Sequence, residues 1–272
     1  MERVTPVTGT FEPIELPSRG VFYDGTDGPT NGILHVRPMT GEEEQVLATQ
    51  RMVQGGIAMD IIFKKCLQEQ NFDPATLLSQ DRTYLMVYLR GISYTPKYDV
   101  EVSCPQCRTK FGASLDLDAM WIDMCPLDFG PDSLSDTLPV TGLEFTYRMS
   151  RGADENDLQQ YQKRQLVERG RESTDDTLTY RTVQLLEEIR DPISGEATSD
   201  KQELEYIVAK LPGGDSAFLR QTVTEPPFGV DTRVEIDCQS PSCGVTFGIA
   251  LPMAADFFFP RPRKGNRTHA TS

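Results

Sequence analysis

Hydrophobic and polar positions alternate along the chain with two different periods, which predict strands and helices. In the first half, residues 33–39 and 98–102 alternate with the period of two that is typical of a half-buried strand. Between them, residues 57–66 and 82–92 carry apolar side chains at helical spacing. The first half is therefore predicted to run from a strand through helices to a second strand.

Two capping patterns predict where helical turns of this half begin. Thr40 precedes Glu43 by three residues, which is the spacing of a capping box, and acidic residues 42–44 favour the positive end of a helix dipole. Asp73 precedes Pro74, which pairs an N-cap with a proline in the first turn. We therefore expect helical turns to start after Thr40 and after Asp73.

The second half repeats the order of the first. Residues 143–150 and 233–237 alternate like strands. The helical pattern between them occupies residues 153–171, 177–189, 201–215 and 216–223. The second half is therefore predicted to contain the same succession of elements, with more helix between its strands.

A constant spacing between similar residues indicates an internal duplication. The pairs that lie 134 residues apart are Asp81 and Asp215, Tyr84 and Phe218, Leu85 and Leu219, Val100 and Val234, and Cys104 and Cys238. Beyond these cysteines the spacing becomes 136, because the second cysteine loop is two residues longer, and upstream Met39 and Met149 lie 110 residues apart. The alternative is that the two hairpins are similar by chance, since turn-rich β-hairpins resemble one another.

The predicted fold class is α+β, with two pseudo-symmetric helical halves that each end in a β-hairpin. The Pro- and Gly-rich start of the chain indicates an extended arm, and a polar stretch in the middle indicates a connector. The predicted segments are an N-terminal arm (1–32), a first repeat (33–125), a connector (126–139), a second repeat (140–256) and an aromatic and basic C-terminal tail (257–272).

Each predicted hairpin carries two cysteines at its tip, in the phrases EVSCPQCRTKFGASL (101–115) and EIDCQSPSCGVTFGIAL (235–251). In such a hairpin one strand enters the cysteine turn and the chain leaves it through F-G. The turn points two thiolates at one spot, so each hairpin would supply half of a tetrahedral site. If the halves pack about a pseudo-twofold axis, the two hairpins meet and one ion binds both. The predicted metal ligands are Cys104, Cys107, Cys238 and Cys243.

Four thiolates are the soft ligands that zinc prefers, and they leave no open position for a reactive water. We therefore expect one structural zinc in a four-cysteine zinc ribbon. Two alternatives stay open, namely disulfides in an extracellular particle and a redox-active C-x-x-C at Cys104 and Cys107. No enzyme is predicted, because the chain has two histidines and lacks G-x-S-x-G, Walker and H-E-x-x-H motifs.

The remaining candidates for chemistry favour structural roles. Cys66 lies on an apolar helical face, where a buried thiol is expected. Cys125 has no partner at ligand spacing, so we expect an inert thiol rather than a fifth ligand or an intermolecular bridge. His35 lies in a predicted strand with no nucleophile motif beside it, so it is expected to be a surface residue.

The charge of the chain limits the partners that it is expected to bind. A formal net charge of −14 repels phosphate backbones and anionic lipids, so neither nucleic acid nor a membrane is predicted as a partner. No window approaches the roughly 18 apolar residues of a spanning helix, so we expect a soluble protein made in a cytosol.

Two stretches near the C-terminus are candidates for contact with other proteins. The aromatic stretch 253–260 either packs in the core or docks on another subunit. The segment after it is basic on an otherwise acidic chain, and it is either a solvated tail or a contact for an acidic neighbour. Its charged residues are Arg261, Arg263, Lys264 and Arg267.

Several phrases together resemble a known family. They are IELPSRGVFYDG, the stretch from ILHVRPMTGEEEQVLATQ to IIFKKCL, and DPATLLSQDRTYLMVYLRGISYTPKYDVEVSCPQC with the F-G-x-x-L that closes its hairpin. These phrases are similar to those of the T4-type bacteriophage baseplate hub and assembly protein family of contractile-tailed phages. The likeness extends over residues 14–118 and, more loosely, 138–255, and the family's cysteine pairs match the four cysteines named above.

The resemblance implies a non-enzymatic component of the tail baseplate, in the hub region, or of its assembly intermediate. It also implies other baseplate and hub proteins as partners, several copies in the virion tail, and a stay in the host cytoplasm during assembly. The alternative from the residues alone is a cytosolic zinc-ribbon adaptor that binds nucleic acid or protein, for which a basic face would be expected.

Overall fold

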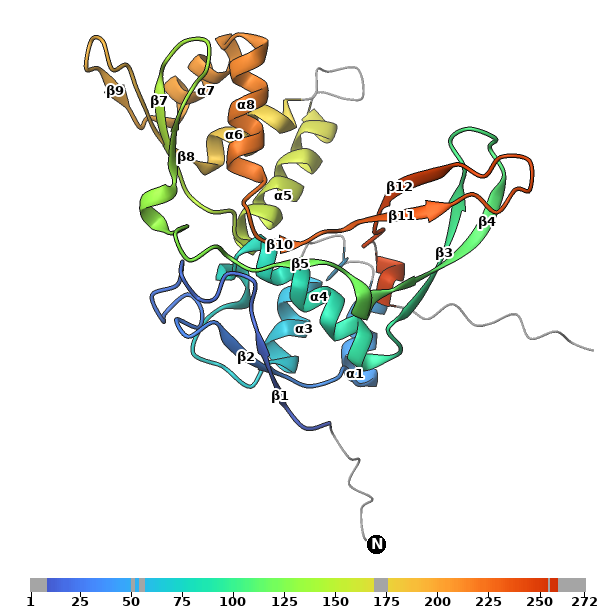
Figure 1. The fold of residues 1–272 in the computed structure, drawn as a ribbon. Coiled ribbons are helices and arrows are strands. Elements are labelled where there is room, and N and C mark those ends of the chain that lie inside the picture. Colours follow the sequence, from blue (N-terminus) through green and yellow to red (C-terminus); the bar gives the residue numbers. More distant parts are fainter. Residues whose placement is uncertain (1–8, 50–51, 54–56, 169–175, 254, 259–272) are drawn as a thin grey trace, which may run out of the picture.

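The computed structural model describes residues 9–49, 52–53, 57–168, 176–253 and 255–258 of the 272-residue chain. Its helices and small antiparallel sheets form an α+β fold, which confirms the predicted class at this level. Figure 1 shows three parts, namely a first body, a second lobe above it and a pair of β-hairpins that project to one side. None of the described helices is long and apolar enough to cross a membrane.

The first body combines a two-stranded antiparallel sheet with helices. Its elements are β1 (Glu12–Glu15), β2 (Ile33–Val36), α1 (Gly41–Ala48), α3 (Ala58–Cys66), the 3-10 turn η1 (Pro74–Thr76) and α4 (Ser79–Ser93). The predicted capping box is present, since Glu43 Oε2 accepts a hydrogen bond from the Thr40 N–H at 2.7 Å. Asp73 caps the turn that follows it, although that turn is a 3-10 helix and α4 begins only at Ser79.

Part of the predicted N-terminal arm belongs to the first body. β1 pairs antiparallel with β2, and Ser18 and Tyr23 are buried. The N–H and hydroxyl of Ser18 donate to the Asp81 carboxylate at 3.0 and 2.6 Å, and the Tyr23 hydroxyl donates to it at 2.7 Å. Proline and glycine content correctly indicated turns here, but these long-range hydrogen bonds anchor the turns on α4.

The second lobe is a four-stranded antiparallel sheet with helices packed on one face. The strands, in spatial order, are β6 (Ser135–Thr137), β7 (Glu144–Tyr147), β8 (Leu186–Arg190) and β9 (Ala197–Thr198). The helices are α5 (Gly152–Glu168), α6 (Thr177–Leu185), α7 (Lys201–Lys210) and α8 (Gly213–Thr224). Buried side chains of β7 and β8 form a core with those of α6, α7 and α8.

Two predictions for this lobe need correction. The pattern over 177–189 predicted one helix, but the helix ends at Leu185 and β8 follows, because a short apolar run fits both periods. The stretch 126–139 was expected to be a connector, but β6 pairs with β7 and Leu138 is buried in the core of the lobe. A strand of three polar residues is too short for its periodicity to be recognised.

The projecting hairpins are β3 (Lys97–Ser103) with β4 (Lys110–Asp116), and β11 (Arg233–Asp237) with β12 (Thr246–Ala250). The short elements that connect the parts are η2 (Leu117–Ala119), β5 (Ile122–Asp123), η3 (Pro131–Ser133), β10 (Gly229–Val230) and η4 (Ala255–Phe258). β10 pairs with β5, so the chain that leaves the second lobe returns to the first body.

Both hairpins pack their apolar faces on the core of the first body. From the first hairpin Val100, Val102 and Leu115 are buried there, and from the second hairpin Val234 and Ile249 pack against the same core. Phe257 and Phe258 are also buried in it, so the predicted tail does not begin at residue 257. The second hairpin therefore lies on the first body and not on the helices of its own half.

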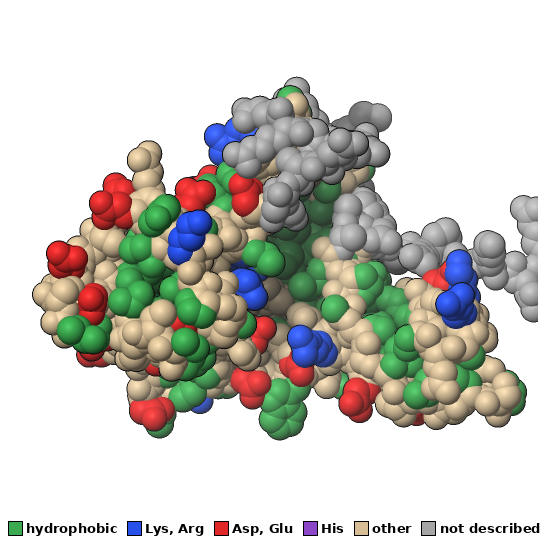
Figure 2. Space-filling view, turned by 90° about the horizontal axis from the view of Figure 1, so that it is seen from above, with side chains coloured by type: hydrophobic (Ala, Val, Ile, Leu, Met, Phe, Trp, Pro, Cys, Tyr) green, Lys and Arg blue, Asp and Glu red, His purple; other side chains and the backbone are tan. Residues whose placement is uncertain are grey.

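The second lobe is joined to the first body at the start of α5. The buried Arg82 of α4 forms an ion pair with Asp60 of α3 at 2.6 Å, and Asn156 of α5 donates to the same carboxylate at 2.8 Å. Arg151 adds an ion pair with Asp27 at 2.6 Å. Figure 2 shows that the lobe and the hairpins lie on either side of a hollow, in which hydrophobic side chains are visible.

Matching contacts occur where the two halves begin. Arg37 binds Glu43 at 3.1 Å at the start of α1, and Arg148 binds Asp154 through two hydrogen bonds of 2.7 Å at the start of α5. The two arginines are 111 residues apart, as are their acidic partners. The contacts therefore align the halves one residue away from the spacing of 110 that the methionines indicated.

Candidate metal centre

The four predicted ligands lie at the tips of the two hairpins. Cys104 follows β3, and its N–H donates to the Thr109 carbonyl at 3.0 Å. Cys238 follows β11, and its N–H donates to the Val245 carbonyl at 2.9 Å. The same backbone hydrogen bond thus closes both turns and sets the direction in which each first cysteine leaves its strand.

A left-handed residue follows the second cysteine of each turn. Arg108, after Cys107, has a φ of 61°, and Gly244, after Cys243, has a φ of 60°. This conformation reverses the chain tightly, and glycine adopts it with far less strain than arginine does. The two turns therefore share one backbone geometry although their loops differ in length.

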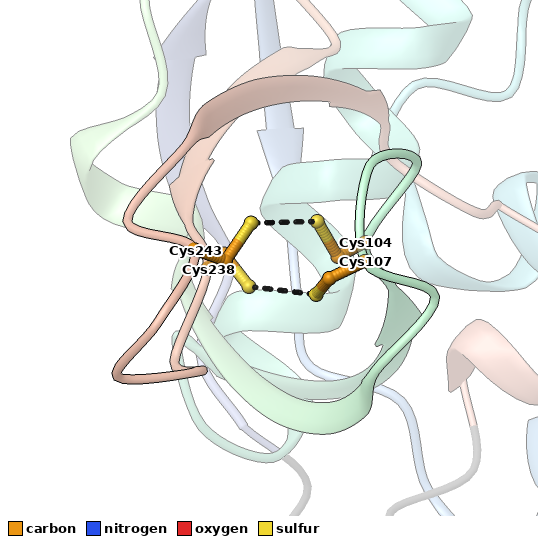
Figure 3. A group of neighbouring side chains, drawn as sticks. All are labelled: Cys104, Cys107, Cys238 and Cys243. Atoms are coloured by element: carbon orange, nitrogen blue, oxygen red, sulfur yellow. Dashed lines mark hydrogen bonds between the residues drawn. The ribbon is translucent and has the colours of Figure 1, made fainter.

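The sulfur atoms of the four cysteines converge, as Figure 3 shows. All four lie within 4.8 Å of one another, with Cys104 Sγ 3.9 Å from Cys243 Sγ and Cys107 Sγ 3.6 Å from Cys238 Sγ. In a tetrahedral zinc site with Zn–S bonds of about 2.3 Å, adjacent sulfurs are about 3.8 Å apart. The separations thus fit a shared ion, and they are too long for the roughly 2.05 Å of a disulfide bond.

The cluster concentrates potential negative charge. Hydrogen bonding to Thr109 lowers the pKa of Cys107 to about 6. The backbone hydrogen bond at Ser240 acts to lower the pKa of Cys238, but burial and the neighbouring thiols outweigh it and raise that pKa to about 12. One thiolate therefore opposes the ionisation of the next, and a bound cation would compensate for this repulsion.

Contacts beside the sulfur atoms hold the two hairpins together. The rings of Phe111 and Phe247 meet edge to face at 6.3 Å between centroids, and Gln239 Nε2 donates to the Gly112 carbonyl at 3.1 Å. Gln239 follows Cys238 directly, and the sequence analysis did not single it out. No local signal marks it, because its partner lies in the other hairpin.

The other candidates lie apart from this cluster. Cys66 is fully buried, as expected for a thiol on an apolar helical face, and burial raises its pKa to about 12. Cys125 is also buried, and its thiol lies 3.5 Å from the Phe129 carbonyl. His35 Nδ1 lies 2.7 Å from Glu69. Among the described residues, the four cysteines are the one group of three or more His, Cys, Asp or Glu that could hold a metal.

The structure describes the two C-terminal candidates for partner contact only up to residue 258. Phe257 and Phe258 are buried in the core of the first body, and the Phe257 ring meets the Tyr98 ring at 5.0 Å between centroids. Core packing therefore explains this part of the aromatic stretch. The four basic residues at 261–267 lie outside the described part of the chain.

Comparison with known protein families gives one match. The model of a family described as T4 bacteriophage base plate protein matches residues 21–259. The matched range contains both cysteine hairpins and the second lobe. No curated protein and no solved structure gives a significant match.

Proposed function

Because the chain belongs to the T4 bacteriophage base plate protein family, we propose that it is a structural or assembly component of the baseplate hub, held in shape by one structural zinc ion. Membership in the family supports a structural role in the virion tail and association with other baseplate proteins. The observation that carries the zinc part of the proposal is the convergence of four sulfur atoms within 4.8 Å.

The proposed ion has a mechanical role. Cys104 and Cys107 would hold it from one hairpin, and Cys238 and Cys243 from the other, so that no ligand position is open to a substrate. Bound zinc supplies positive charge to four thiolates that otherwise repel one another. Because both hairpins contribute to the core of the first body, an ion that joins their tips would stabilise that core. This is the basis for proposing a non-catalytic protein.

A duplicated architecture is part of the proposal. Its support is the matched contacts of the two halves, namely the arginine–carboxylate pairs at the starts of α1 and α5 and the matching left-handed residues in the cysteine turns. A duplication explains why ligands from turns more than 130 residues apart meet at one point. It also fits a site formed where related hairpins face each other.

Metal analysis of protein purified under reducing conditions tests the zinc proposal. We expect one zinc per chain, lost on Cys238→Ser but kept on Cys125→Ser, since Cys125 is a buried cysteine outside the cluster. Iron is the other metal that suits four thiolates in a tetrahedron, and its thiolate absorption would reveal it. Iron as the bound metal, or no metal with four reactive thiols, would overturn the assignment of zinc.

A phage experiment tests the baseplate role separately. A phage that lacks this chain should fail to complete its baseplates, and wild-type chain supplied in the infected cell should restore them. Mass spectrometry of purified tails would show whether the chain stays in the virion or acts only in the host cytoplasm during assembly. Complete baseplates at wild-type number without the chain would contradict a structural or assembly role.

A further inference from the structure

An acidic groove runs between the two hairpins, on the side where β4 and β11 face each other. It has a volume of about 520 Å³, within the range of clefts that bind small ligands. Four consecutive residues of β4, 113–116, line one wall, and five consecutive residues of β11, 233–237, line the other. The groove therefore follows the direction of two strands.

Both walls are strand edges that pair with no further strand among the described residues. The turn hydrogen bonds place Thr109 and Val245 opposite Cys104 and Cys238, so in β4 the even-numbered residues, and in β11 the odd-numbered ones, direct their backbone groups away from their own hairpin. The Gly112 carbonyl confirms this direction, because it accepts a hydrogen bond from Gln239 across the groove. In the described part of the chain, β4 and β11 belong to separate two-stranded sheets.

The outward edge groups that line the groove belong to Ser114 and Asp116 on β4 and to Glu235 and Asp237 on β11. The outward N–H of Arg233 already donates to the Asp231 carboxylate at 2.8 Å. Exposed strand edges of this kind are templates for an additional strand, which binds through main-chain hydrogen bonds. A segment in extended conformation could thus pair with either edge or with both.

The charge of the groove indicates what kind of segment fits. The lining side chains include one arginine and four carboxylates, those of Asp116, Asp231, Glu235 and Asp237. None of these five charged groups has an ion-pair partner within 4.0 Å among the described residues. Excess negative charge beside unpaired strand edges favours a basic partner.

An exposed aromatic residue is also part of the lining of this groove. Trp121 is 71% exposed, and its carbonyl accepts a hydrogen bond from the Asp231 N–H at 3.0 Å. A tryptophan face attracts arginine and lysine side chains by cation–π interaction, and tryptophan is enriched among the residues that dominate protein interfaces. The ring and the carboxylates thus favour the same class of ligand.

We propose that the groove between β4 and β11 binds an extended, basic segment of another baseplate protein by adding it as a strand. The proposal rests on the proposed function, since the partner is a baseplate protein. Binding would turn two separate hairpins into one continuous sheet beside the metal site. Incorporation into the baseplate would then be coupled to the shape that the metal sets.

Fluorescence of the full chain tests the proposal, because Trp121 is its only tryptophan. The probe is a nine-residue synthetic peptide that alternates Arg or Lys with Thr or Val, and in the control peptide Glu replaces each basic residue. We expect a saturable change in Trp121 emission with the basic peptide alone, and weaker binding as salt is added. No saturable change, or the same change with both peptides, would overturn the proposal.

Two variants locate the binding. Glu235→Lys reverses a charge on the wall of the groove, and Ser114→Pro removes an outward N–H at a strand edge, where proline is tolerated. Each should weaken peptide binding at least about fivefold. Glu205→Lys makes the same change of charge on the exposed face of α7 and should leave binding unchanged. Equal affinities for the wild-type chain and both groove variants would place the peptide elsewhere.

One further comparison separates a partner from the chain itself. If a chain that ends at Phe258 binds the peptide much more tightly than the full chain does, the basic C-terminal residues of this protein occupy the groove, and the assignment to a partner is overturned. Equal affinity of the two chains supports a partner. The peptide assay needs no phage, so its failure would leave the proposed baseplate role to be tested by complementation.

Discussion

Asp81 and Asp215 hold matching places 134 residues apart, each in the first turn of a helix and each bound by the N–H and hydroxyl of one loop residue. For Asp81 this residue is Ser18, and for Asp215 it is Thr141, at 2.9 and 2.7 Å. Burial raises the pKa of Asp81 despite these bonds. Burial also acts to raise the pKa of Asp215, but hydrogen bonds from Thr141 and its neighbour outweigh it, and that pKa is lowered.

The opposite pKa shifts predict opposite effects of pH on two matched variants. The folded-state pKa of Asp215 lies below the unfolded value of about 3.9, so its stabilisation is complete above that value and is lost as pH falls through the folded pKa. Asp81 has a folded pKa above the unfolded value, so its ionisation costs stability as pH rises through the folded pKa. Urea unfolding from pH 7 to pH 3 measures both effects. The stability lost on Asp215→Asn should shrink toward low pH, whereas that lost on Asp81→Asn should grow.

The wild-type chain, measured over the same pH range, is the reference for both variants. Parallel stability curves for the two variants would show that the loop hydrogen bonds do not differ in their electrostatic environment. They would also remove the basis for treating Asp81 and Asp215 as groups with different charge preferences.

The left-handed turn at Arg108 predicts a stabilising substitution. Arg108→Gly should raise the free energy of unfolding by about 1 kcal/mol, because glycine adopts a φ of 61° without the steric cost that a side chain imposes. Gly244→Ala, at the matching position, should lower it by a similar amount, since the added Cβ meets nothing within 4 Å and only the backbone is strained. Denaturant unfolding of the metal-loaded protein measures both changes.

Gly248→Ala is the control for this pair. Gly248 also has open space at its Cβ, but it lies in β12 and its φ is not positive. Its substitution should leave stability unchanged or slightly raised. A loss at Gly248 as large as that at Gly244 would mean that conformational strain is not the cause.

A substitution at Gly152 tests how tightly the second lobe packs on the first body. A Cβ at this position would lie 2.4 Å from the Arg82 guanidinium, which is buried and bound to Asp60 and therefore cannot move away cheaply. Gly152→Ala should thus destabilise the protein by about 1–3 kcal/mol. Gly41→Ala is the matched control, because Gly41 begins α1 as Gly152 begins α5 and has no neighbour within 4 Å. Thermal unfolding that shows equal losses for the two variants would contradict this account of the joint.

Metal removal should affect the two cores unequally. Hairpin residues form part of the core of the first body, but none lies in the described core of the second lobe. Chelation, or Cys238→Ser, should therefore lower amide protection in β3, β4, β11, β12 and α4 by at least about tenfold, while α7 and α8 keep theirs. Hydrogen exchange followed by mass spectrometry measures this difference. Simultaneous loss of protection in both cores would show that the chain unfolds as one cooperative unit.

Local patterns in the sequence were sufficient to predict the structure where the interacting groups are close along the chain. The capping box at Thr40 and Glu43 and the hairpin phrases around the cysteines fall in this class. The four cysteines could be predicted as candidate metal ligands from residue type and repetition, because soft ligands of one kind in matching turns have few other uses. Their proximity in space was a geometric prediction, and the sulfur separations agree with it.

The sequence patterns of short or polar segments were not sufficient to predict their secondary structure. The apolar run that begins at Leu186 fits a helix as well as a strand, and it became β8 because β7 and β9 pair with it. β6 has no apolar residue, so only its pairing with β7 reveals it. In both places the deciding hydrogen bonds come from other segments of the chain.

The chain encodes its helix starts, its turns and the chemistry of its four thiols within stretches of about ten residues, where neighbouring groups interact whatever the rest of the protein does. Long-range packing alone set three other features: the anchoring of the N-terminal turns on Asp81, the position of the second hairpin on the first body, and the acidic groove between the hairpins. These depend on surfaces far apart in sequence that become adjacent only after folding. Apolar burial is not directional, and the sequence pattern does not reveal which apolar faces will meet.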